Sequence, residues 1–362
     1  MRRTRVFLFV GTFILICLGV VMVYSSSSIL AFTKYKDSAF FLKRQFLFFM
    51  LGMMILPFIM VTDYRVLKKF SKLILIFSLL LLVLVLIPGI GHSVFGARRW
   101  FRFFGFSFQP SELALLSIVI YLASFLSQRN KDIKNFFSGL LPPLFVTVLL
   151  FLLTLLQPDL GTAFLMGVIS LIILYVGGAR LSHIFSLCLF SLPFIYLIVF
   201  TVPYRALRIT AFLNPWLDPK GSGFQMVQSQ IALGSGGLFG LGLGRGRQKL
   251  FFLPANHTDF IFSNIGEELG LMGVSFVLIL FLIILVCGFK IIRNCSESFG
   301  FYLGFGIVSI ILLKAIVHMG VGVGLFPTKG LPLPFISYGG SSFLFDLIGI
   351  GILLNISKNS CA

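Results

Sequence analysis

The polar residues able to carry out chemistry in this 362-residue chain are few, and they gather in four stretches. The stretches are GARRWFRFFGFSFQPSE at 96–112, QPDLGT at 157–162, a long segment at 203–265, and PTKGLPLPFISYGGSS at 327–342. They contain several cationic side chains and very few carboxylates. This combination suits group transfer from a phosphorylated donor, since cations can bind the phosphates while one carboxylate removes a proton from the acceptor.

Asp259, in His257-Thr258-Asp259, is our first candidate for that base. An apolar stretch that is expected to be helical follows it, and on such a helix Glu267 would lie about 80° from Asp259 and could share its cavity. Asp259 could instead cap the N-terminus of this helix, since Asp is a favoured N-cap residue. The residues alone leave both interpretations open.

Candidate substrate ligands lie in the same stretches. Arg98, Arg99 and Lys249 could bind a pyrophosphate. Trp100 could stack on a sugar ring, although tryptophans also anchor helices at membrane interfaces. Glu112 lies at the end of an apolar stretch, where pairing with Arg98 or Arg99 is the simpler interpretation.

One cation lies inside an apolar stretch. Ionisable residues at membrane depth are functional candidates, and they usually have a partner. We expect Lys314 to reach a carboxylate such as Glu268 or Asp159, or to extend outwards. A structural ion pair is as good an interpretation as a substrate contact.

Composition sets the class of protein. Hydrophobic residues make up 58% of the chain, charged residues 11%, and the mean hydropathy is +1.06. These values exclude a soluble enzyme, a disordered regulator and a secreted disulfide scaffold. The net charge of +18 does not indicate nucleic-acid binding, because the basic residues form short clusters between apolar runs. Such clusters suit anionic membrane lipids and phosphate-bearing substrates.

The apolar runs predict an all-α integral membrane protein with ten transmembrane helices, forming a single domain over 1–362. A span needs about 20 mostly apolar residues. The glycine-rich region at 221–244 is assigned to a loop rather than to an eleventh span, because irregular backbone facing lipid is costly. The predicted spans are 6–24, 45–62, 71–88, 112–127, 139–156, 161–177, 182–202, 266–289, 299–321 and 339–355.

Lysine and arginine predict the orientation. When the long segment at 203–265 is not counted, lysines and arginines are more frequent in the short loops on the same side of the membrane as the N-terminus. Both termini are therefore expected on the cytoplasmic side. The four polar stretches then lie on the outer face, with 203–265 joining helices seven and eight. An outer site has no ATP, so the substrate must arrive energised, and lipid-linked sugars fit this requirement.

Five motifs together resemble the SEDS family (shape, elongation, division, sporulation). They are GARRW with FQPSELA, QPDLGTA, NPWLDPKGSGFQ, QKLFFLPANHTDFIFSNIGEELG and PTKGLPLPFISYGGSS, and they cover nearly the whole chain in the family's order. The asparagine-proline-tryptophan of NPWLDP, PTKGLPLP and GEELG are more similar to the division branch than to the elongation branch. The sporulation branch shares these features.

The resemblance implies residue roles. Asp259 matches the family's essential aspartate, Arg99 and Trp100 match its outer-loop pair, and Glu112 matches its acid. The motifs around the same cavity also contain Lys249, His257, Lys329 and Ser337. Three positions depart from the pattern: Leu115 stands where lysine is usual, and Lys314 and His318 stand where glutamine and asparagine are usual. Lys314 could replace the charge missing at 115.

The resemblance also implies an activity and partners. SEDS members polymerise lipid II into peptidoglycan glycan strands at the outer face of the bacterial cytoplasmic membrane, releasing undecaprenyl pyrophosphate. The expected partners are a class B penicillin-binding protein, which is a transpeptidase, and other division proteins at the septum. No resident cofactor or metal site is expected, and any magnesium or manganese ion would arrive with the pyrophosphate. The alternatives are a lipid II flippase, a non-catalytic division scaffold, and the elongation or sporulation polymerase.

Overall fold

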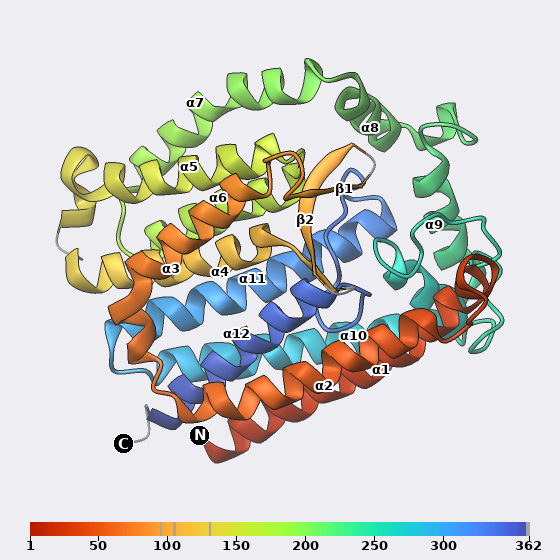
Figure 1. Cartoon of the computed structure of the whole chain (residues 1–362), viewed down its shortest axis with the longest axis horizontal. Coiled ribbons are helices and arrows are strands. Elements are labelled where there is room, and N and C mark those ends of the chain that lie inside the picture. Colours follow the sequence, from red (N-terminus) through yellow and green to blue (C-terminus); the bar gives the residue numbers. More distant parts are fainter. Residues whose placement is uncertain (95, 104–105, 130–131, 360–362) are drawn as a thin grey trace.

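The computed structural model describes residues 1–94, 96–103, 106–129 and 132–359, which form a bundle of helices with one small β-sheet (Figure 1). Short helical turns lie at Asp132–Lys134, Phe136–Leu140 and Pro215–Leu217. The elements are α1 (Arg2–Tyr35), α2 (Phe40–Val61), α3 (Arg65–Leu84), β1 (His92–Val94), β2 (Ala97–Phe103), β3 (Phe106–Phe108), α4 (Pro110–Arg129), α5 (Leu141–Leu156), α6 (Leu160–Val176), α7 (Leu181–Phe200), α8 (Pro203–Leu213), α9 (Phe224–Ser235), α10 (Ile261–Arg293), α11 (Ser298–Val323) and α12 (Gly340–Asn359).

Eight of the described helices are long and apolar enough to cross a membrane, so the chain is a multi-pass helical membrane protein. They are α1, α2, α4, α5 with the turn before it, α7, α10, α11 and α12. The other two predicted spans correspond to α3, whose first two turns are strongly basic, and to α6, which has 17 residues. The total of ten spans stays a prediction. The start of α1 and the end of α12 lie at the same end of the bundle (Figure 1).

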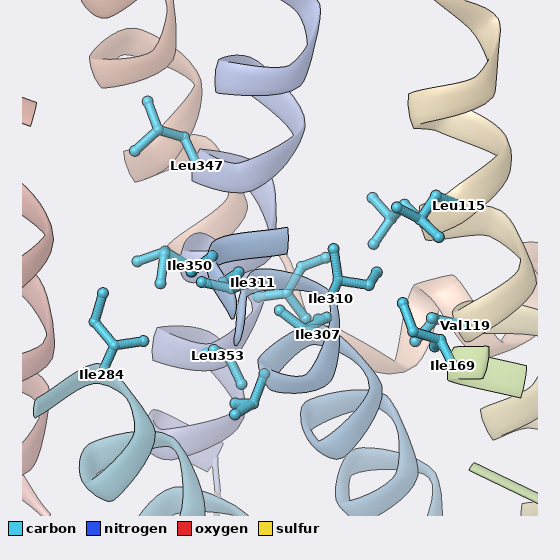
Figure 2. Packing of buried hydrophobic residues seen from close by; sticks show 14 of the residues in the cluster. Leu115, Val119, Ile169, Ile284, Ile307, Ile310, Ile311, Leu347, Ile350 and Leu353 are labelled. Atoms are coloured by element: carbon cyan, nitrogen blue, oxygen red, sulfur yellow. The ribbon is translucent and has the colours of Figure 1, made fainter. Parts of the chain in front are cut away.

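The core lies where α4, α6, α10, α11 and α12 meet. Figure 2 shows side chains from these helices packed together, among them Leu115, Ile169, Ile284 and Leu353. Along α11, Ile307, Ile311 and then Lys314 follow at helical spacing, so the lysine continues a buried apolar stripe. By contrast, no residue of α7 is buried, and this helix lies apart from the others (Figure 1).

The long segment at 203–265 is more ordered than the sequence predicted. It contains α8 and α9, so the assignment of 221–244 to an irregular loop is wrong for Phe224–Ser235. α9 packs on α10 and α11, where Ser229 Oγ lies 2.6 Å from Ser263 Oγ and donates to the Gly322 carbonyl at 2.7 Å. Polar side chains in this region therefore meet other helices rather than lipid.

A small antiparallel sheet joins α3 to α4, and the all-α prediction did not include it (Figure 1). Its order is β1-β2-β3, with His92 opposite Trp100 and Arg102 opposite Ser107. Aromatic residues, which favour strands, make up much of the segment. The sheet lies at one end of the α3–α4 pair, and the chain termini lie at the other (Figure 1).

Candidate active site

A cavity of about 610 Å³ opens beside the sheet. It is enclosed by the start of α2, the three strands, the turn before α10, and the segment at 330–342 that leads into α12. Four segments far apart in the sequence therefore meet here. The lining residues most relevant to chemistry are Arg44, Arg99, Trp100, Arg102, Gln109, Thr258, Asp259, Tyr338 and Ser342.

Asp259 lies in the turn before α10. Its own N–H donates to the Ala255 carbonyl at 2.9 Å, while the N-cap of α10 is Phe260, with no side-chain hydrogen bond. The structure therefore does not support the capping interpretation. The 330–342 segment approaches the carboxylate closely, since a Cβ at Gly330 would lie 3.4 Å from Asp259 Oδ2.

The surroundings of Asp259 disfavour its charged form. Burial raises the pKa of this carboxyl to about 6, although the charges of Arg208 and Arg99 and a hydrogen bond from Thr258 act in the opposite direction. No ion pair reaches Asp259 from the described residues. A carboxylate with a pKa near neutrality is matched to general-base chemistry.

Two neighbouring arginines of strand β2 have different surroundings. Arg99 lines the cavity and donates through its guanidinium to the Gln157 carbonyl at 2.9 Å and to the Pro158 carbonyl. Arg98 is not among the cavity-lining residues and reaches the Leu86 carbonyl at 3.4 Å. Trp100 lines the cavity as the sequence predicted.

Ser337 and His257 support the cavity from behind. Ser337 Oγ donates to the Thr258 carbonyl at 2.8 Å and accepts from the Leu333 N–H at 2.9 Å, which fixes the 330–342 segment to the turn of Asp259. The His257 ring packs 4.7 Å from that of Phe41, and its burial lowers its pKa to about 4, so the imidazole is neutral.

Lys329 lies just outside the cavity lining, with its Nζ 4.4 Å from the centroid of the Phe164 ring. Burial lowers the pKa of its ammonium group. A half-buried lysine over an aromatic ring is held by a cation–π contact. None of the contacts described for Ser337, His257 and Lys329 is with Asp259 itself.

Glu112 lies in a different place from the one expected. Lys314 Nζ donates to Glu112 Oε2 at 2.6 Å, to Asp346 Oδ1 at 3.0 Å and to Ser342 Oγ at 3.1 Å. The expectations that Glu112 pairs with Arg98 or Arg99, and that Lys314 reaches Glu268 or Asp159, are therefore wrong. The helices α4, α11 and α12 bring these residues together in the core, which sequence spacing could not indicate.

Asp159 instead caps α6, accepting from the Thr162 N–H at 3.3 Å. His318, the third departure from the family pattern, places its Nδ1 2.8 Å from the Leu331 carbonyl. Both residues are buried. These contacts hold helix ends and the 330–342 segment in place.

Lys249, Glu267 and Glu268 form a second cluster away from the cavity lining. Lys249 Nζ lies 3.1 Å from Glu268 Oε1, and Glu268 also accepts from Ser25 of α1. Glu267 accepts from the Arg247 N–H at 2.7 Å. The expectation that Glu267 shares the cavity of Asp259 is not met, because α10 begins after Asp259 and the helical angle does not apply.

Sequence reasoning missed four residues near Asp259. Arg44, Gln109 and Tyr338 line the cavity, and Arg208 of α8 acts on Asp259 through its charge. Arg44 and Gln109 lie at the outer ends of predicted spans, a signal that was available in the sequence. In the part of the chain that the structure describes, no group of three or more His, Cys, Asp or Glu side chains could hold a metal ion.

Comparisons with known proteins identify relatives of this chain. A family model described as "Cell cycle protein", covering FtsW, RodA and SpoVE, matches residues 5–361. The chain is 47% identical over 343 residues to "Probable peptidoglycan glycosyltransferase FtsW" of Geobacter metallireducens, with 95% of this chain and 92% of the relative covered. It is 44% identical over 349 residues to "Stage V sporulation protein E" of Bacillus subtilis, with 96% and 95% covered.

Solved structures are also similar. One chain, from "Structural coordination of polymerization and crosslinking by a peptidoglycan synthase complex", gives a TM-score of 0.81 at 29% identity, covering 98% of this chain and 97% of that one. RodA of Thermus thermophilus gives a TM-score of 0.73 at 28% identity, with the same coverage. The chain therefore belongs to the FtsW/RodA/SpoVE family of cell cycle proteins, as the SEDS resemblance predicted.

Proposed function

We propose that this chain is a peptidoglycan glycosyltransferase that polymerises lipid II into glycan strands at the outer face of the cytoplasmic membrane during division. The observation that carries the proposal is Asp259, a carboxylate with a raised pKa in a cavity with Arg44, Arg99, Arg102 and Trp100. The relatives named FtsW and the similarity to a peptidoglycan synthase complex support it. N-terminus inside and C-terminus inside, with ten spans, is the proposed topology.

The chemistry follows from this arrangement. Asp259 accepts the proton of the 4-hydroxyl of the acceptor sugar, and the hydroxyl oxygen attacks the anomeric carbon of the donor. The bond to undecaprenyl pyrophosphate breaks with inversion, and the phosphates leave with the electron pair. Positive charge from Arg44, Arg99 and Arg102 stabilises the negative charge that develops on the leaving group.

Two of the sequence-predicted phosphate ligands are not among the cavity-lining residues, since Arg98 reaches Leu86 and Lys249 pairs with Glu268. Arg44 and Arg102 take their place in the proposal. Asp259 is the single acidic residue that the described part of the chain contributes to the lining. A magnesium or manganese ion, where required, would arrive with the pyrophosphate and share this carboxylate.

A class B penicillin-binding protein is the proposed partner, supplying crosslinking beside polymerisation at the septum. The support is the similar chain solved within a complex that coordinates polymerisation and crosslinking. Other division proteins and anionic membrane lipids are proposed to surround the pair.

The test is glycan-strand formation from purified lipid II by the chain co-purified with its partner, with moenomycin present to inhibit unrelated polymerases. Asp259→Asn, which is nearly isosteric, should lower the rate by about 10²- to 10⁴-fold, the contribution usual for a general base. Asp63→Asn is the matched control, since Asp63 is an exposed carboxylate just before α3, at the end of α2 opposite to Arg44 and outside the cavity lining. It should keep the wild-type rate.

Product from both wild type and Asp259→Asn would keep the polymerase and remove Asp259 as the base. Product from neither, with a folded complex, would favour the flippase or scaffold alternatives. Movement of lipid II across vesicles would then separate these two, because a scaffold predicts none.

A further inference from the structure

A second cavity, of about 670 Å³, lies between α3 and α4 at the end of the helix pair opposite Asp259. α3 begins at this cavity and runs to the sheet, while α4 runs back from the sheet and ends here; the two helices lie side by side (Figure 1). With 20 residues, α3 spans about 30 Å, so the two cavities are separated by a membrane's thickness. The lining residues are Arg65, Lys68, Lys69, Ser71, Lys72, Tyr121, Ser124, Phe125, Gln128 and Arg129.

Five of these lining residues are cationic, and none of those described is acidic. Arg65 is paired outside the cavity, with its Nε 2.8 Å from Glu297 Oε2. The charge of Lys68 also acts on the Glu297 carboxylate. Four further cations thus line one open cavity, to which the described residues contribute no carboxylate: Lys68, Lys69, Lys72 and Arg129.

The first two turns of α3 carry this charge at an energetic cost. Four basic residues lie at a helix N-terminus with no acid in the first turn, where the helix dipole disfavours cations. Arg65 and Lys69, and likewise Lys68 and Lys72, are four residues apart and repel each other. A bound anion would remove both penalties at once.

A hydroxyl that faces the cavity adds an independent sign of a ligand. Ser71 is 4% exposed and lines the cavity, and no hydrogen bond of its hydroxyl is found among the described residues. Within the described residues, this hydroxyl is therefore free to bond to a ligand in the cavity. A phosphate oxygen could accept from this hydroxyl while the surrounding lysines neutralise the phosphate charge.

The face of α3 that is exposed beyond the basic turns is apolar. Phe70, Leu73, Ile76, Phe77 and Leu80 follow the basic turns along α3, and each is at least 44% exposed. Their spacing forms one stripe along the helix. At about 100° per residue these side chains lie about 100–180° around α3 from Ser71, so this face of the helix is turned away from the cavity and borders lipid. A cation-lined pocket at the end of a lipid-facing helix is within reach of a charged lipid headgroup.

We infer that the α3–α4 cavity binds the phosphate of an anionic phospholipid from the leaflet on the side of the chain termini. The cavity volume is suitable for a small headgroup. This site is independent of the polymerase chemistry, because it shares no lining residue with the cavity of Asp259.

The experiment measures lipid binding to the detergent-purified full chain by native mass spectrometry. Dioleoyl phosphatidylglycerol should bind more tightly than dioleoyl phosphatidylcholine. Lys69→Gln with Lys72→Gln should weaken the phosphatidylglycerol affinity by at least about tenfold, since each basic residue contributes about 1 kcal/mol. Lys290→Gln with Arg293→Gln is the matched control, because it removes two exposed charges from the last turn of α10. It should change the affinity less than about twofold.

Ser71→Ala keeps every charge and should still weaken binding by about threefold to tenfold through the lost hydrogen bond. Equal binding of both lipids, or equal losses in the two double variants, would overturn the inference. Inorganic phosphate and sn-glycerol 1-phosphate form the soluble arm. Competition by either at the concentration of the lipid would overturn the lipid assignment and assign the cavity to a soluble phosphate.

Discussion

Two carboxylate centres in this chain use the same residue types in opposite ways. In the core, Glu112 and Asp346 both accept hydrogen bonds from Lys314, and all three are at most 3% exposed. In the cavity, Asp259 has arginines nearby but no ion pair from the described residues, and burial raises its pKa. A carboxylate already neutralised by a lysine is a poor base, whereas an unpaired one can take a proton. The presence or absence of an ion pair therefore distinguishes Glu112 and Asp346, which stabilise the fold, from Asp259, which is available for chemistry.

Lys314→Ala is expected to cause the largest loss of stability and tests this contrast. It leaves two buried carboxylates without their cation, and breaking a buried pair typically costs about 3–5 kcal/mol of unfolding free energy. Thermal or denaturant unfolding of the detergent-purified protein measures it. Lys43→Ala is the matched control, because the Lys43–Asp37 pair is 70% and 38% exposed and should contribute less than about 1 kcal/mol. Equal losses in the two variants would remove the structural assignment of the Lys314 cluster.

A smaller effect tests whether the position of the positive charge matters. Leu115 is 1% exposed and lines one small cavity with Glu112, Lys314 and Asp346. The double variant Leu115→Lys with Lys314→Gln should therefore recover about 2 kcal/mol of the loss caused by Lys314→Gln alone. Unfolding and a complementation assay measure this recovery. If the double variant is no more stable than Lys314→Gln, then a lysine at position 115 cannot replace the cation of Lys314.

Sequence reasoning identified what depends on local pattern. Apolar runs predicted the helical membrane class, and five motifs predicted the family. Asp259, Arg99 and Trp100 were placed on one cavity because their stretches were expected on the same side of the membrane. Residues on one face of a helical bundle come together when the loops that carry them pack together, and such loops can be identified in a sequence.

Partners across the bundle were not predictable. Glu112 precedes Lys314 by 202 positions, and their contact depends on how α4 and α11 are rotated towards each other. The assignment of Arg98 also failed, because the strand was not foreseen and Arg98 bonds to the Leu86 carbonyl, outside the cavity lining. Glu267 was misplaced because its angle was counted from Asp259 as if that residue were helical, whereas α10 begins at Ile261.

The pH dependence of polymerisation sharpens the role of Asp259. Its pKa of about 6 means that the base is deprotonated above this value and protonated below it. The rate should be level above neutrality and fall about tenfold per pH unit below 6, which is about 1.4 kcal/mol per unit. Arg208→Gln should move the midpoint upwards, because the charge of Arg208 lowers this pKa. A rate that is unchanged down to pH 5 would contradict an Asp259 base.

The last expected effect concerns stability and has the opposite sign to that of Lys314→Ala. The folded state raises the pKa of Asp259 from 3.8 to about 6, so the folded protein binds this proton more tightly than the unfolded chain does. Stability is therefore lost as pH rises from about 4 to 6. Asp259→Asn removes this loss and should raise the unfolding free energy at pH 7.5 by about 3 kcal/mol, with no gain at pH 4, since each pKa unit is worth about 1.4 kcal/mol. Thermal unfolding at both pH values measures this difference. If the variant is inactive but more stable than the wild type at neutral pH, then the unpaired charge of Asp259 serves the chemistry and destabilises the fold. A destabilised Asp259→Asn would instead place Asp259 with Glu112 and Asp346 among the carboxylates that hold the structure.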